Sequence, residues 1–105
     1  MRIVAALLVM VALPALAGNP PIPADRDKVI NQASDLVPWC KAEAEYRYRL
    51  KDITPYQWTA SYHDRSGILF VEGKLRVHDE DVAVRCHVSQ GMRGTYAAIE
   101  IDDSF

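Results

Sequence analysis

The sequence lacks most of the features that identify a functional class at once. It has only two cysteines and five glycines in 105 residues, and its 14 acidic residues barely outnumber its 12 basic ones. Two cysteines are too few for a disulfide-dense scaffold, and a net charge of −2 argues against a nucleic-acid partner. Beyond residue 17 there is no apolar run of the about 20 residues that a transmembrane helix needs. These absences favour one small domain without a cofactor.

The only long apolar run lies at the N-terminus and is typical of a cleaved secretory signal. Met1 and Arg2 precede apolar residues 3–13, and the run ends in small residues up to Ala17. We therefore expect residues 1–17 to be a signal peptide, 18–23 an extended leader with three prolines, and 24–105 a single domain. Without Arg2 the net charge falls to about −3. The expected location is the bacterial periplasm or the cell exterior.

Export determines how the two cysteines are interpreted. Outside the reducing cytosol, Cys40 and Cys86 are expected to form a disulfide bond rather than a metal site. A mature chain of about 88 residues has a marginal hydrophobic core. Closing a loop of roughly 46 residues would add up to about 4 kcal/mol to its stability.

A change of hydrophobic period near residue 55 predicts an α+β fold. From Ala24 to Leu50 the apolar residues recur at three- and four-residue spacing, which predicts an amphipathic helix, kinked or split in two near Pro38. After Pro55 the pattern alternates, and short connections favour a four-stranded antiparallel meander covered by the helix. The predicted strands are Gln57 to His63, Ile68 to Val77, Val82 to Val88 and Thr95 to Asp102.

Alignment of the apolar faces of the four strands predicts their register. It places Trp58, Gly73, Cys86 and Ala97 in one cross-strand row, where the small residues let the helix approach and the Trp58 ring lies beside the sulfurs. The alternative for Gly73 is a β-bulge. The pairs that define this register are Tyr62 with Leu69, Val77 with Val82, and Val88 with Thr95. The resulting core face comprises Trp58, Ala60, Tyr62, Leu69, Val71, Leu75, Val77, Val82, Val84, Cys86, Val88, Ala97, Ile99 and Ile101.

The opposite face of the sheet holds the candidate binding site. Ile68 and Phe70 point away from the predicted core, which makes them exposed apolar groups on an otherwise polar face. Such a patch is typical of a protein-binding surface. The alternative is that the leader or residues 103–105 fold over it. The predicted protein-binding patch is Ser61, His63, Ile68, Phe70 and Tyr96.

Two other functions are carried as alternatives. His63 and His78 each precede an aspartate, and His87 lies in mid-strand beside Glu72, so a metal-dependent or hydrolytic enzyme is one of them. The predicted fold does not bring these histidines together. A metal site would consist of His78, Asp79 and Asp81. The basic residues Arg47, Arg49 and Lys51 could instead bind an anionic envelope polymer.

No motif in the sequence fixes a reaction. The expectation is therefore a small exported domain that binds another exported or envelope protein, as an inhibitor, an immunity protein or an envelope accessory protein does, and that has no catalytic activity.

Overall fold

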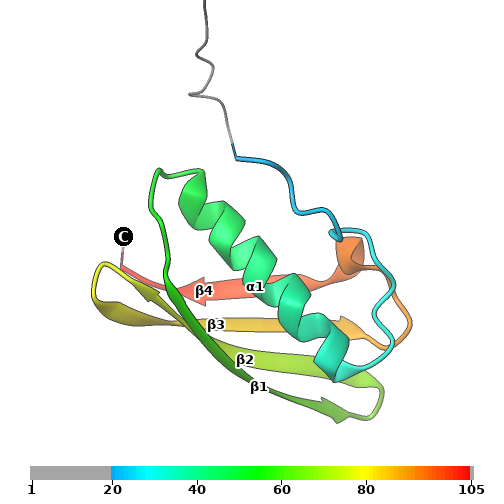
Figure 1. The fold of residues 1–105 in the computed structure, drawn as a ribbon. Helices are drawn as coiled ribbons and strands as arrows, with labels where there is room; N and C mark the ends of the chain where they lie inside the picture. Colours follow the sequence, from blue (N-terminus) through cyan, green and yellow to red (C-terminus); the bar gives the residue numbers. More distant parts are fainter. Residues whose placement is uncertain (1–19, 105) are drawn as a thin grey trace, which may run out of the picture.

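The fold is one helix packed on a four-stranded antiparallel sheet, as the sequence predicts. The computed structural model describes residues 20–104, so the predicted signal peptide, residues 1–17, lies outside the described residues. Helix α1 crosses one face of the sheet, and within residues 20–104 no helix or further strand covers the other face (Figure 1). The sheet order is β1-β2-β3-β4, with a 3-10 helix, η2, before the last strand. The elements are α1 Ala33–Arg49, β1 Gln57–Arg65, β2 Ile68–Val77, β3 Glu80–Ser89, η2 Gly94–Tyr96 and β4 Ala98–Asp102.

Helix α1 is continuous through Pro38, so of the two predicted alternatives the split into two helices is wrong. The proline is the sixth residue of the helix, so a single carbonyl, that of Ser34, lacks its helical donor. Asp35 in the first turn and Arg47 and Arg49 in the last turn suit the helix dipole, as the sequence indicates.

The predicted start of the helix at Ala24 is also wrong. The segment before α1 pairs with the loop that follows β3: Ile30 N–H donates to the Met92 carbonyl at 2.9 Å, and Gly91 N–H donates to the Ile30 carbonyl at 2.7 Å. An isolated antiparallel bridge joins Val29 to Arg93. Because these backbone groups are used in pairing with a distant loop, they are not available for helical hydrogen bonds.

Both of the first two hairpins turn in two residues, which corrects the predicted register. Ser66 and Gly67 have φ of 53° and 83°, and His78 and Asp79 have φ of 51° and 68°. Left-handed conformations at both positions are those of a type I′ turn, whose twist matches the flanking strands. Asp64 and Arg65 therefore join β1, residues 80–81 join β3, and the predicted pairs are displaced by two positions. The predicted start of the last strand at Thr95 is wrong, because residues 94–96 form η2 and β4 begins at Ala98. The observed pairs include Tyr62 with Val71, Leu75 with Val82, and Cys86 with Ile99.

A displacement of two leaves each side chain on its predicted face, because the period of a strand is two residues. The core side of the sheet is therefore largely as predicted. Ala60 and Tyr62 are exceptions, since both are exposed although they belong to the core face. The buried hydrophobic residues are Ile30, Ala33, Leu36, Trp39, Cys40, Ala44, Tyr48, Leu69, Val71, Leu75, Val77, Val82, Val84, Cys86 and Val88.

The predicted disulfide between Cys40 and Cys86 is present and joins α1 to an inner strand. Their Cα atoms lie 6.0 Å apart, within the usual range for a disulfide. Both cysteines are buried in the centre of the core. The bond therefore fixes the helix to β3.

The predicted cross-strand row through Gly73 is wrong in its members. Gly73 lies between Ala60 and Val84, and the ladder runs past it without a bulge. The space above Gly73 is taken by the Trp58 ring, because an added Cβ would stand 2.3 Å from Trp58 Cη2. Gly73 thus makes room for an indole ring on the neighbouring strand rather than for the helix backbone.

Candidate protein-binding surface

The open face of the sheet is the face opposite α1. The described parts of both termini lie on the helix side: the Arg26 guanidinium bonds to Glu43 of α1, and Tyr48 Oη of α1 donates to Asp103 Oδ2 at 2.5 Å. Neither residues 20–30 nor residues 103–104 are therefore folded over the open face. Phe105 lies outside the described residues.

An aromatic row crosses this open face. His63 and Phe70 are paired across β1 and β2, and their rings stack with centroids 5.0 Å apart and planes 13° apart. His87 of β3 is paired with Phe70 on its other side, with centroids 6.0 Å apart and planes 36° apart. We call His63, Phe70 and His87 the aromatic row. Phe70 is half-buried rather than exposed as the sequence predicts, and its ring lies between two imidazoles that can each donate or accept a hydrogen bond.

Of the other predicted patch residues, Ile68 and Ser61 lie on the open face by strand alternation, whereas Tyr96 lies in η2, where residues 93–95 bond to the chain before α1. Ile68 is half-buried at the turn end of β2, where it pairs with Arg65 and Ser89. Ser61 is exposed and faces Glu72. Tyr96 lies in η2 and is 69% exposed.

His87 is the member of the site that sequence reasoning missed. The predicted register put His87 beside Glu72, whereas the observed one puts it beside Phe70. Recognising the two-residue turns would have revealed this neighbour. A shallow hollow of about 370 Å³ adjoins the row between β2, β3 and β4, and the Arg85–Glu100 ion pair at 3.0 Å lies within it. Charged and aromatic groups around an open hollow suit contact with a protein surface.

The histidines do not form a metal centre in the described part of the chain. Residues 20–104 contain no group of three His, Cys, Asp or Glu side chains placed to hold an ion. At the proposed site after His78, Arg76 Nη1 binds Asp81 at 3.1 Å, and Tyr56 Oη donates to Asp79 at 3.1 Å. These carboxylates are therefore engaged by an arginine and a tyrosine.

The basic residues at the end of α1 are partly engaged within the chain. Arg49 lies 3.9 Å from Glu45, and the Lys51 ammonium lies 5.9 Å from the centre of the Tyr48 ring. Arg47 is exposed on the last turn. Arg47 and Lys51 line a hollow together with Asp103, whereas Arg49 pairs with Glu45.

The chain before α1, residues 20–32, is called the leader from here on, and a polar contact attaches it to the middle of the helix. Arg26 binds the carboxylate of Glu43 through two hydrogen bonds of 2.8 and 3.1 Å, and the Trp39 indole N–H donates to the Arg26 carbonyl at 2.9 Å. Gly94 allows this close approach, because an added Cβ would stand 2.2 Å from the Arg26 carbonyl oxygen. We call these contacts the leader clasp.

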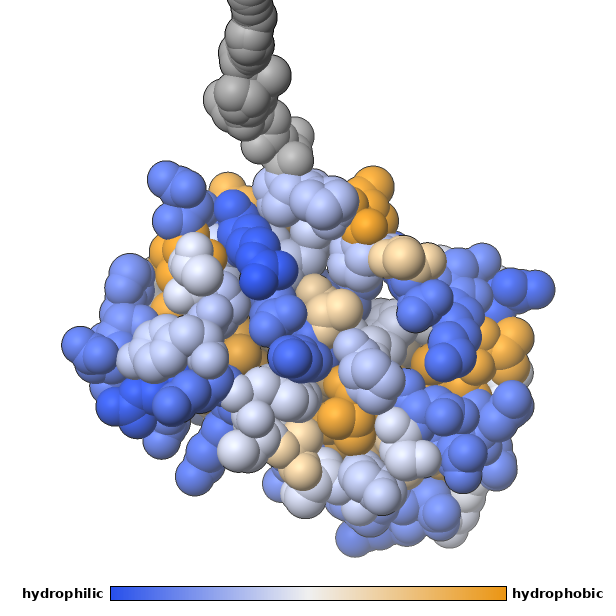
Figure 2. All heavy atoms as spheres, in the orientation of Figure 1, coloured by the Kyte–Doolittle hydropathy of each residue, from blue (hydrophilic) through white to orange (hydrophobic). Residues whose placement is uncertain are grey.

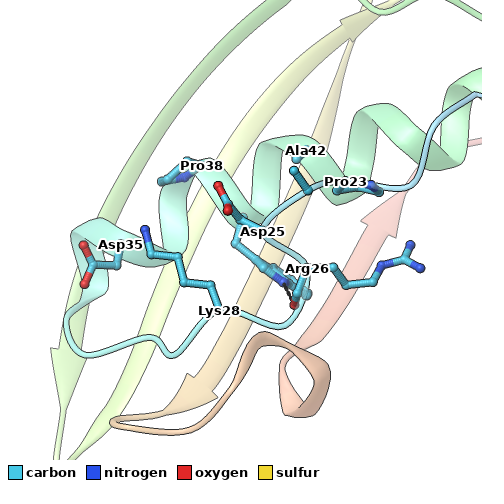
Figure 3. Close-up of a pocket in the computed structure, with 9 residues that line it drawn as sticks. Pro23, Asp25, Arg26, Lys28, Asp35, Pro38 and Ala42 are labelled. Carbon is cyan, nitrogen blue, oxygen red and sulfur yellow. Dashed lines mark hydrogen bonds between the residues drawn. The ribbon is translucent and has the colours of Figure 1, made fainter.

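A small cavity lies between the leader and α1, with Pro23, Asp25, Pro38 and Ala42 around it (Figure 3). Its volume is about 120 Å³. Small-molecule sites usually enclose 300 Å³ or more, so this cavity is too small for most metabolites.

The surface seen in the orientation of Figure 1 is mainly hydrophilic, with separate hydrophobic spots (Figure 2). In the part of the chain that the structure describes, no helix is long and apolar enough to cross a membrane. Comparison of the sequence with protein-family models and with curated proteins, and of the fold with solved structures, found no match. The geometry of the open face is therefore the basis for assigning a function.

Proposed function

We propose that this chain is an exported domain that binds another exported or envelope protein through the open face of its sheet. It would act as an inhibitor, an immunity protein or an envelope accessory protein, by binding rather than by catalysis. The N-terminal signal pattern and the disulfide are compatible with an oxidising compartment.

The aromatic row is the observation that carries this proposal. Phe70 stands between two imidazoles on a rigid sheet held to α1 by the disulfide, so little conformational entropy is lost when a partner covers it. Aromatic groups surrounded by polar ones are typical of the residues that dominate binding energy. The salt bridge of Arg85 with Glu100 provides a polar border.

The test is partner capture from an envelope extract, followed by a titration with each partner that mass spectrometry identifies. Phe70→Asp should weaken binding about tenfold or more, since loss of one central contact costs more than about 1.4 kcal/mol. Lys74→Asp is the matched control, because it lies on the same strand and the same face and changes the charge by a larger amount. It should retain binding.

Both variants must show the circular dichroism spectrum and melting temperature of the native protein. Equal affinity of the native protein and Phe70→Asp for every captured partner would exclude the aromatic row as the binding surface.

A further inference from the structure

Strand β1 has an unexpected exposure on the side of the sheet that α1 covers. Tyr62 belongs to the core face by its position in the strand, yet it is 55% exposed, and Ala60 is exposed too. Every residue of β1 except Trp58 is exposed. The helix therefore leaves the outer part of the core face uncovered along this strand.

The backbone of β1 is uncovered as well, because β1 is the first strand of the sheet. In a two-residue hairpin the residues that flank the turn exchange both of their hydrogen bonds, here Arg65 and Ile68. Alternation then directs the N–H and C=O groups of residues 58, 60, 62 and 64 away from β2. Within residues 20–104, these groups take part in none of the backbone hydrogen bonds formed outside the ladders.

Exposed edges in monomeric proteins are usually protected by proline, lysine, a bulge or a covering segment. Strand β1 has the sequence QWTASYHDR, with neither proline nor lysine; its two charged residues, Asp64 and Arg65, are confined to the turn end, and all nine residues pair with β2 without a bulge. It is a regular edge that can accept another strand.

We propose that β1 pairs antiparallel with β1 of a second copy of this chain, across a two-fold axis at Ser61. Residues whose N–H and C=O groups point away from β2 in one copy must lie opposite residues of the same kind in the other copy. In β1 these are the even-numbered residues. Among the registers that satisfy this condition, the one with Ser61 opposite Ser61 pairs all nine residues of β1. The two sheets then form one eight-stranded sheet with both helices on the same side.

The side chains in this register fit together in size and bring no like charges opposite one another. Tyr62 of each copy lies opposite Ala60 of the other, so the exposed ring gains a neighbour and a small residue gives it space. Arg65 lies opposite Gln57, and Asp64 lies opposite Trp58. No two like charges face each other.

The test is the mass of the purified protein in solution, measured by sedimentation equilibrium over a roughly hundredfold range of concentration. The native protein should reach twice the mass of one chain. Ser61→Lys and Ser61→Glu should each lose the dimer, because like charges would then meet on the axis. An equimolar mixture of the two variants should restore it.

Ser89→Lys is the matched control, because it is the same substitution on the same face at the exposed end of an inner strand. It should remain dimeric. Ser61→Cys gives a second measurement that does not depend on lost association: paired residues on the axis are close enough for a disulfide, so mild oxidation should give a covalent dimer, and Ser89→Cys should not.

A native protein that stays monomeric at every concentration would overturn the proposal, as would a Ser61→Lys dimer or a mixture that stays monomeric. The inference does not rest on the proposed function: Phe70→Asp should keep the dimer while losing the partner. A monomer that still binds a partner would refute only the pairing of β1.

Discussion

Removing the arginine of the leader clasp is the most direct perturbation of this fold. Glu43 is 5% exposed, and Arg26 provides both of the hydrogen bonds that its carboxylate receives from side chains in the described residues. The same contact raises the pKa of the Arg26 guanidinium, chiefly through its hydrogen bond with Glu43. Arg26→Met keeps most of the side-chain length and removes the charge.

The expected loss of stability depends on how well water hydrates the Glu43 carboxylate once Arg26 is replaced. Removing one partner of a fully buried ion pair costs about 3–5 kcal/mol. The Arg26 side chain is 39% exposed, and the leader can move away from α1 and hydrate Glu43, so the expected loss is smaller, about 2 kcal/mol. For a domain of this size that corresponds to a fall of about 10 °C in the melting temperature.

Urea unfolding of Arg26→Met, of Glu43→Leu and of the double variant measures this loss. The double variant should be more stable than Arg26→Met, because no charge is then left in the core. Trp39 packs beside the clasp, so its emission should shift to longer wavelength in Arg26→Met as the leader moves away. A free energy of unfolding of Arg26→Met within about 0.5 kcal/mol of the native value would refute the reasoning.

Three further outcomes are expected. Cys86→Ser should lower the free energy of unfolding by about 4 kcal/mol, which is the chain-entropy value for a 46-residue separation. Reduction of the native protein with dithiothreitol should likewise lower its melting temperature. Ser66→Val should cost about 1–2 kcal/mol in urea unfolding, because a β-branched residue resists the left-handed conformation, whereas Ser66→Asn should not. Burial and the hydrogen bond to Asp103 raise the pKa of Tyr48. The unfolded chain ionises first, so stability should be complete below about pH 10 and fall as pH rises further, and Tyr48→Phe should flatten that fall.

The faces of the strands could be predicted from sequence, whereas their register could not. Alternation assigns a face to residues such as Leu69 and Val84, and a displacement of two positions does not change it. The register depends on turn length, and neither Ser66-Gly67 nor His78-Asp79 is the Asn-Gly pair that marks a two-residue turn.

The helix start and one member of the site were missed for related physical reasons. Ile30 fits helical spacing as well as a strand, and only its pairing with residues 91–92 decides between them. Phe70 and His63 were predicted to share the open face, and the disulfide of Cys40 was predicted from the compartment. His87 became their neighbour only through the observed register.

The position of the disulfide also divides the chain topologically. Residues 41–85 lie inside the covalent ring, and with them β1, β2 and both two-residue turns, whereas the leader and β4 lie outside it. A protease that nicks either of those turns leaves two fragments still tied together, which separate on a gel only after reduction. A nick in the loop after β3 has no such tether, so the last strand is the part of the sheet that cleavage can release.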